Sequence, residues 1–123
     1  MSMHGWMHRS DEIEAVAAIF RTLSDPTRLR ILVALAEAEA CVHELCDKVG
    51  MSQPAVSHQL RLLRLAHLVR CRREGREIYY AIEDEHVMEL MGQARTHASH
   101  VGREPARSLR HAEPARAARV RLK

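Results

Sequence analysis

The stretch GMSQPAVSHQLRLLR, residues 50–64, decides how this chain folds. It opens with Gly50, a residue type that commonly ends a helix, and Ser52, a type that commonly starts one. After Ser52, apolar side chains recur at i, i+4 and i+7, which is the spacing of one helix face. These side chains are Val56, Leu60 and Leu63. The outer side of the helix holds polar and basic residues: Gln53, Ser57, His58, Arg61 and Arg64. The pattern predicts an amphipathic helix capped by Ser52.

Three helices are predicted upstream of this stretch. Ser10 caps the first, over about residues 11–23, where apolar residues have helical spacing. Asp25 caps the second, and Pro26 follows at a position where a missing N–H costs no helical hydrogen bond. A short third helix covers about 42–49 and ends at the glycine that follows it. The apolar stripe of the second helix is predicted to be Leu29, Leu32, Val33 and Leu35.

A β-hairpin is predicted downstream, in LVRCRREGREIYYAI at residues 68–82. Two strand-like runs flank Glu74-Gly75, which is a tight-turn signal. The second run alternates apolar and aromatic residues on one side: Ile78, Tyr80 and Ile82. The order of helix, helix, short helix, capped helix and hairpin is typical of a winged helix-turn-helix. The predicted fold class is therefore mainly α with a small β-hairpin.

The capped helix and the hairpin together form a candidate surface for double-stranded DNA. Residues 52–76 contain six arginines and one glutamate, which favours a polyanionic partner. In a winged helix-turn-helix the capped helix enters the major groove and the hairpin follows the DNA backbone. The candidates for base contacts are Gln53, Ser57 and His58, and those for phosphate contacts are Arg61, Arg72, Arg73 and Arg76. The alternative is a polar helix surface in a small bundle, which leaves the basic hairpin unexplained.

The composition limits the classes of protein that fit. A chain of 123 residues buries one modest core, and we expect a flexible arm at 1–10, one domain at 11–101 and a basic, disordered tail at 102–123. Without a long apolar run or a signal-peptide pattern, a cytoplasmic protein with no membrane partner is expected. Three cysteines without a C-x-x-C pair fit a reducing compartment. Aromatic residues make up only 3%, which disfavours a single-strand binder built on base stacking.

The last predicted helix carries four side chains that bind metals or protons, within DEHVMELMGQARTHASH at 84–100. His86, His97 and His100 fall on one stripe at about 100° per residue, and Asp84 lies at the helix cap. An apolar arc runs beside this stripe, so the helix is expected to pack against a partner.

Distance determines how these four side chains could share a metal. His86 and His97 are about 16 Å apart along a helix that rises ~1.5 Å per residue. Bonds from zinc to imidazole or carboxylate are only about 2.0–2.2 Å long, so one helix cannot bring all four groups to one ion. Two antiparallel copies can, because Asp84 and His86 of one chain then meet His97 and His100 of the other, twice per dimer. Four nitrogen and oxygen ligands favour tetrahedral Zn²⁺, with Co²⁺ as a substitute.

Over residues 11–100 the chain resembles the ArsR/SmtB family of metal-sensing repressors. The stretches that carry the likeness are LSDPTRLRIL at 23–32, GMSQPAVSHQLRLLR at 50–64, REGREIYY at 73–80, and Asp84-x-His86 followed by His97-x-x-His100. The last pattern is similar to the interhelical site of the family's zinc and cobalt sensors. The resemblance implies a homodimer, joined through its first and last helices, on an inverted repeat of operator DNA. It also implies release on binding Zn(II) or Co(II), which derepresses metal efflux or resistance genes.

Several alternatives stay open. Some members of the family bind metal through Cys-Val-Cys, and the matching stretch here is Cys41-Val42-His43, which lacks the second thiolate. A mixed second metal site could therefore combine Cys41 and His43 with His4 and His8. A six-coordinate nickel or cobalt sensor, completed by terminal histidines such as His111, is the main rival. A metal-storage protein leaves the basic helix and hairpin unexplained. No motif for an enzyme or a small organic substrate is present in the sequence.

Overall fold

The computed structural model describes residues 9–101. Residues 1–8 of the predicted arm, the predicted tail at 102–123 and the predicted ligands His4, His8 and His111 lie outside this range. The chain divides into two compact units, the first ending at Val87 and the second beginning at Met88, and each is described by itself. Within the described range, no helix is both long and apolar enough to span a membrane.

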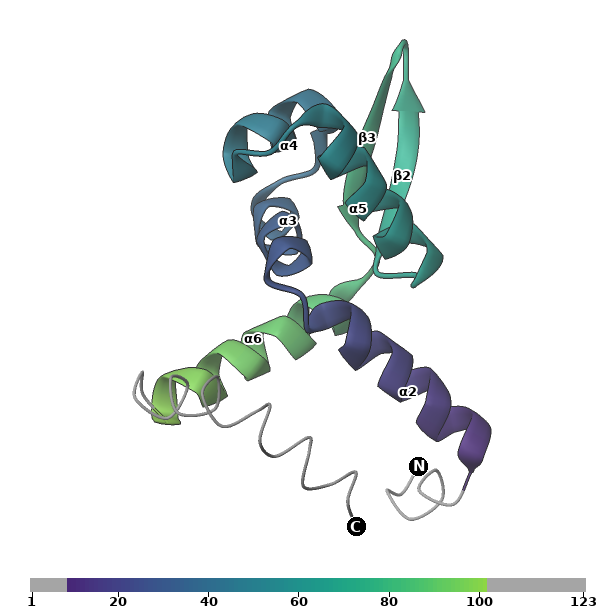
Figure 1. The fold of residues 1–123 in the computed structure, drawn as a ribbon, viewed down its shortest axis with the longest axis vertical. Helices are drawn as coiled ribbons and strands as arrows, with labels where there is room; N and C mark the ends of the chain where they lie inside the picture. Colours follow the sequence, from purple (N-terminus) through teal and green to yellow (C-terminus); the bar gives the residue numbers. More distant parts are fainter. Residues whose placement is uncertain (1–8, 102–123) are drawn as a thin grey trace. The chain divides into compact units, whose positions relative to one another are not determined.

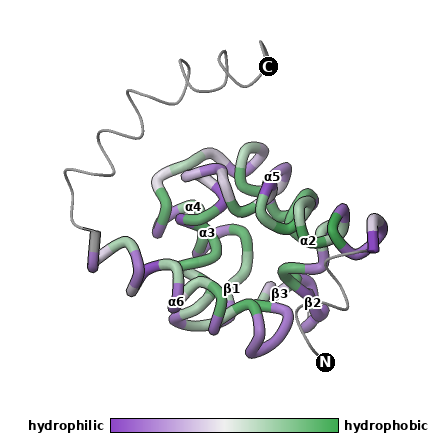
Figure 2. The backbone as a smooth tube through the Cα atoms, turned by 90° about the horizontal axis from the view of Figure 1, so that it is seen from below, coloured by the Kyte–Doolittle hydropathy of each residue, from purple (hydrophilic) through white to green (hydrophobic). Residues whose placement is uncertain are grey.

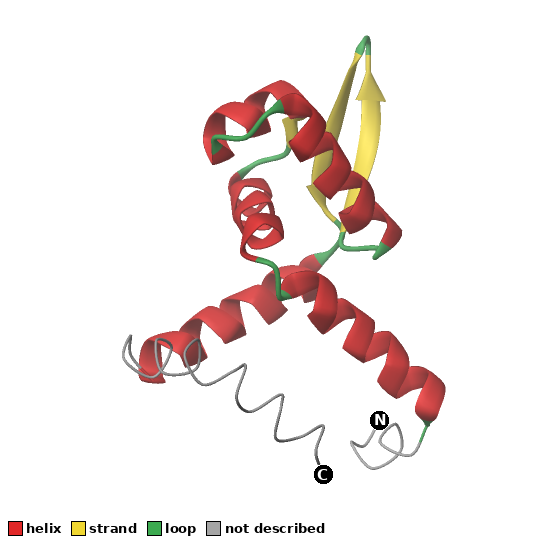
Figure 3. Cartoon of the chain, in the orientation of Figure 1, coloured by secondary structure: helices red, strands yellow, loops and turns green. Residues whose placement is uncertain are grey.

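The elements follow the predicted order, with one addition (Figures 1 and 3). They are α2 (Ser10–Leu23), α3 (Pro26–Glu37), β1 (Ala40–Cys41), α4 (Val42–Val49), α5 (Gln53–Leu65), β2 (Val69–Glu74), β3 (Glu77–Ile82) and α6 (Glu85–Val101). The two-residue strand β1 is the addition, and it is too short to show a sequence period. The predicted class, mainly helical with a small hairpin, is confirmed.

The helix ends show why these residues form these helices. Asp25 accepts a hydrogen bond from the Arg28 amide at 2.9 Å, and Ser52 accepts one from the Ala55 amide at 3.3 Å. Gly50 ends α4 with φ +70°, in the left-handed region where a side chain is disfavoured. The prediction for the first helix was wrong by one position. Arg9 is its N-cap, without a side-chain bond, and Ser10 is already helical.

Removal of the α3 cap provides a test of this local account. We expect Asp25→Ala to lower the free energy of unfolding by about 0.5–2 kcal/mol, since the Arg28 amide loses its acceptor. Asp25→Asn keeps an acceptor at the same position and should stay close to wild type. Urea unfolding followed by circular dichroism measures both variants. Equal losses in the two variants would contradict the capping role.

The sheet has the order β1-β3-β2, and both pairings are antiparallel. In the hairpin, Glu74 pairs with Glu77, so the tight turn consists of Gly75 and Arg76, one position later than the predicted Glu74-Gly75. Gly75 has φ +64°, and glycine at the first central position suits a two-residue hairpin turn. The residues of β2 are mostly hydrophilic (Figure 2). The hairpin therefore presents basic residues on a short, closed turn.

The core of the first unit lies among α3, α4, α5 and the sheet. Its fully buried large side chains are Ile31, Leu32, Leu45, Val56, Leu60 and Leu63. The predicted inner face of α5 is thus confirmed at all three of its positions. Because α3 packs against α4, α5 and β3, the core holds α5 by its buried face. The other side of α5 is exposed to solvent.

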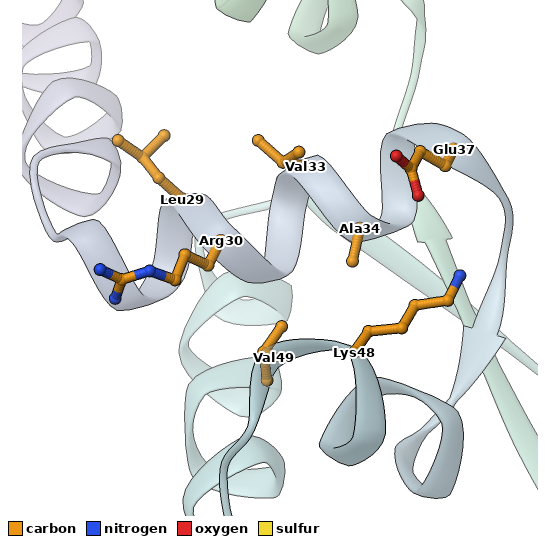
Figure 4. A pocket seen from close by; sticks show the side chains of 7 residues that line it. All are labelled: Leu29, Arg30, Val33, Ala34, Glu37, Lys48 and Val49. Atoms are coloured by element: carbon orange, nitrogen blue, oxygen red, sulfur yellow. The ribbon is translucent and has the colours of Figure 1, made fainter.

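The predicted stripe of α3 was wrong at two positions. Leu29 and Val33 are 36% and 54% exposed, whereas the buried residues are Ile31, Leu32, Ala34 and Leu35. At about 100° per residue, Leu29 and Val33 lie roughly opposite Ile31. The helix carries two apolar arcs, and α4, α5 and β3 cover only one of them. The uncovered arc borders a shallow pocket that Val49 and Lys48 of α4 also line (Figure 4).

Candidate nucleic-acid interface and metal ligands

The outer face of α5 presents all the residues predicted to contact DNA bases. Gln53, Ser57 and His58 are exposed, as is Arg61 one turn further on. All four lie outside the buried stripe of the helix, so contact with a ligand would not disturb the core. The base-contact candidates lie in the first two turns of α5, near its N-terminus, the end that enters the major groove in helix-turn-helix proteins. The arrangement can therefore donate to and accept from base edges.

A side-chain contact that the sequence did not reveal links α5 to the end of α2. Arg28 of α3 donates from Nε to the Thr22 carbonyl at 2.8 Å and from Nη1 to Gln59 Oε1 at 3.4 Å. Thr22 lies in the last turn of α2, so one guanidinium joins the end of α2 to the middle of α5. Only the fold shows this link, because Arg28 and Gln59 are 31 residues apart.

The hairpin arginines fall into two groups. Arg76 lies in the turn and is exposed, and Arg73 donates from Nε to the Gly75 carbonyl at 3.2 Å. Both therefore lie at the tip, where a wing can reach DNA phosphates. Arg72 differs, because its guanidinium bonds Glu39 and Glu74. Glu39, just before β1, carries no sequence signal for this role.

The four predicted metal ligands lie on or beside α6. Asp84 caps the helix, as predicted, and its Oδ1 accepts a hydrogen bond from the Val87 amide at 3.1 Å. His86 Nδ1 lies 3.6 Å from the same oxygen. His97 and His100 are exposed in the later turns. Among the residues described for one chain, no three potential ligands come together. The shared two-chain site thus stays a prediction.

The alternative metal site at the start of α4 includes a buried thiol, whereas the predicted ligands of α6 are exposed. Cys41 is 6% exposed and stands at the N-cap of α4, where its amide donates to Glu44 Oε1 at 3.0 Å. His43 is exposed. A metal at this site would need a thiol that is already packed into the core. The other two cysteines, Cys46 and Cys71, are half-buried.

A core-anchored helix with a polar outer face, followed by a basic antiparallel hairpin, defines a winged helix-turn-helix DNA-binding protein. Residues 25–70 match the family described as "Bacterial regulatory protein, arsR family". The chain belongs to this family of transcriptional regulators.

Two relatives and one solved structure show which proteins the chain is similar to. A transcriptional repressor, an SmtB homolog from Synechocystis sp., is 46% identical over 87 residues, which cover 71% of this chain and 66% of that protein. A cadmium resistance regulatory protein, a CadC homolog from Staphylococcus aureus, is 39% identical over 70% of this chain and 72% of its own length. The homodimeric winged helix-turn-helix domain from Mycobacterium bovis has a TM-score of 0.74 at 30% identity, over 79% of this chain and 90% of that one.

Proposed function

We propose that this protein is a zinc-responsive transcriptional repressor that binds operator DNA as a homodimer in the cytoplasm and leaves it when Zn(II) binds. The observation that carries the proposal is the distribution of ligands along α6. Asp84 and His86 adjoin its first turn, His97 and His100 lie in its later turns, and all four side chains are exposed. Ligands spread along one exposed helix suit a site completed by a second chain.

The geometry of α6 supports an antiparallel pair. His86 and His97 are separated by about 16 Å of helix, far more than a metal site spans. In an antiparallel pair, the first turn of each helix lies beside the last turns of the other, which creates two equivalent sites. Leu90 and Met91, near the centre of α6, are only half-buried within one chain. A partner helix would cover this apolar surface. The Mycobacterium bovis relative is described as homodimeric.

This arrangement couples metal binding to DNA binding. Metal that joins the two α6 helices fixes how the paired winged units face the DNA, and a spacing that does not fit the half-sites lowers the affinity. By linkage, DNA must weaken metal binding by the same factor. A typical coupling of 1–3 kcal/mol corresponds to about a 5–150-fold change in affinity.

The identity of the metal has two candidates. Three imidazoles and one carboxylate suit tetrahedral Zn²⁺, because a closed set of four nitrogen and oxygen ligands completes its shell. A six-coordinate nickel or cobalt site would need further ligands from the terminal histidines His4, His8 and His111. The cadmium-resistance relative shows that the family includes regulators named for other metals. A cadmium site built on thiolates is disfavoured here by the lone, buried Cys41.

A Co²⁺ titration of the reduced protein, followed by visible absorption, tests the proposal. We expect intense tetrahedral bands that saturate at about one Co²⁺ per chain, with no sulfur charge transfer, and operator release over the same range. His97→Ala should abolish the bands. His58→Ala, an exposed histidine of α5 outside the ligand set, is the matched control and should retain them. Weak octahedral bands would favour the nickel and cobalt alternative, and strong thiolate bands would favour Cys41.

A further inference from the structure

Arg72 makes an ion pair of unusual extent for an exposed hairpin residue. Its Nη2 and Nε donate to the two carboxylate oxygens of Glu39, which is the two-pronged geometry that arginine forms with carboxylates. Its Nη1 donates to Glu74 on the same strand. The guanidinium also lies over the Tyr79 ring, 5.1 Å from the ring centre. One side chain of β2 thus reaches across β3 to the segment that leads into β1.

We propose that Arg72 is a positioning residue that braces the wing against Glu39, and not a contact to DNA phosphate. The inference rests on the proposed DNA-binding function and specifies how the wing serves it. The three residues Arg72, Glu39 and Tyr79 are called the brace below. The brace holds the direction of the hairpin, so that Arg73 and Arg76 at its tip meet the DNA backbone.

The charges at the brace make it a poor place for a phosphate. The guanidinium of Arg72 is bonded to two carboxylates, that of Glu39 within the brace and that of Glu74 beside it, so its positive charge is already balanced by its own partners. The Arg72 guanidinium holds the pKa of Glu39 below its usual range, so this carboxylate is ionised at neutral pH. A phosphate that approached Arg72 would have to replace the carboxylates already bonded to its guanidinium.

The strand pairing explains how the brace can hold the hairpin in place. In register, Arg72 faces Tyr79, and Tyr79 faces Cys41 on the two-residue strand β1. Because β1 is so short, it pairs with β3 only at Tyr79 and Tyr80, in the middle of that strand. Glu39 adjoins Ala40, which is 1% exposed and therefore anchored in the core. The bond from Glu39 to Arg72 extends this anchorage to β2, the outer strand of the hairpin.

Four glutamine variants distinguish a brace from a phosphate contact. Binding is measured by fluorescence anisotropy across salt concentrations, on a duplex from upstream of the protein's own gene. We expect Glu39→Gln and Arg72→Gln each to weaken binding about twofold to fivefold, the range of a single exposed ion pair, with the salt slope unchanged. Arg76→Gln should lower the slope by about one. Glu37→Gln removes an exposed carboxylate of α3 that lies outside the brace, and it should not weaken binding.

The Glu39 variant is decisive, because removal of a negative charge should by simple electrostatics strengthen DNA binding. Tighter binding by Glu39→Gln, or a salt slope lowered by about one in Arg72→Gln, overturns the brace. A second readout requires no DNA. Hydrogen exchange of the β3 amides should be faster in Glu39→Gln and Arg72→Gln than in Glu37→Gln, and equal exchange also overturns the brace. Failure of the wild-type protein to bind the duplex would contradict the proposed function. The hydrogen-exchange comparison needs no DNA, so it would still test the brace.

Discussion

Two variants that bind no metal alone should regain metal binding when their chains are mixed. The first variant carries Asp84→Asn and His86→Ala, and the second carries His97→Ala and His100→Ala. In the antiparallel arrangement each homodimer lacks half the ligands of both sites. A mixed dimer pairs the intact Asp84 and His86 of one chain with the intact His97 and His100 of the other. It therefore contains one complete site and one empty site.

The amount of metal recovered makes the test quantitative. Random pairing puts half of the chains into mixed dimers with one complete site of two, so about a quarter of the wild-type Co²⁺ capacity is expected. Loss of a residue that only hydrogen-bonds a metal ligand typically lowers metal affinity by ~10–100-fold. Each variant alone lacks two ligands per site, so its metal affinity should fall by more than that. Asn at position 84 retains an acceptor for the Val87 amide, so α6 keeps its cap. A mixture that binds no more metal than its parents would contradict the shared site.

The second large effect concerns the core under the DNA-binding helix. We expect Leu60→Ala to lower the free energy of unfolding by about 2–5 kcal/mol, since Leu60 is completely buried and its loss leaves a cavity. That is a large fraction of the 5–15 kcal/mol typical of a whole domain. Leu65→Ala is the matched control on the same helix, because Leu65 is 71% exposed.

Chemical denaturation at fixed protein concentration separates the two leucine variants. The concentration must be held constant because the unfolding of a dimer depends on it. Leu65→Ala should stay within about 0.5 kcal/mol of wild type, as expected for an exposed position. Similar losses in the two variants would mean that the outer side of α5 is covered in the folded dimer. That result would place Leu65 in an interface between chains.

The helices of this fold could be read from the sequence wherever the local chemistry allowed one arrangement. Asp25, Gly50 and Ser52 act on neighbours within a few residues, and all three have their predicted roles. The buried face of α5 was also determined locally, because its apolar residues form a single arc. On α3 there are two apolar arcs, and only the packing of other elements decides which one is buried. Leu29 and Val33 were misassigned for that reason.

Contacts between distant segments could not be predicted. Strand β1 exists because Ala40 and Cys41 find partners in β3, and two residues carry no period of their own. Glu39 and Gln59 owe their roles to arginines 33 and 31 residues away. For the metal ligands, the helical spacing of α6 predicts which residues share a face. Whether they share an ion depends on a second chain, which no spacing within one sequence describes.

The exposure of the proposed ligands has a consequence for how such regulators diversify. His86, His97 and His100 lie outside the core, so their replacement should leave the fold of a single chain intact. Selection could then exchange one metal preference for another by point mutation, without compensating changes elsewhere. Asp84 is the exception, because its carboxylate also caps α6. Among the four positions it should vary least, and mainly towards Asn or Ser, which cap helices about as well.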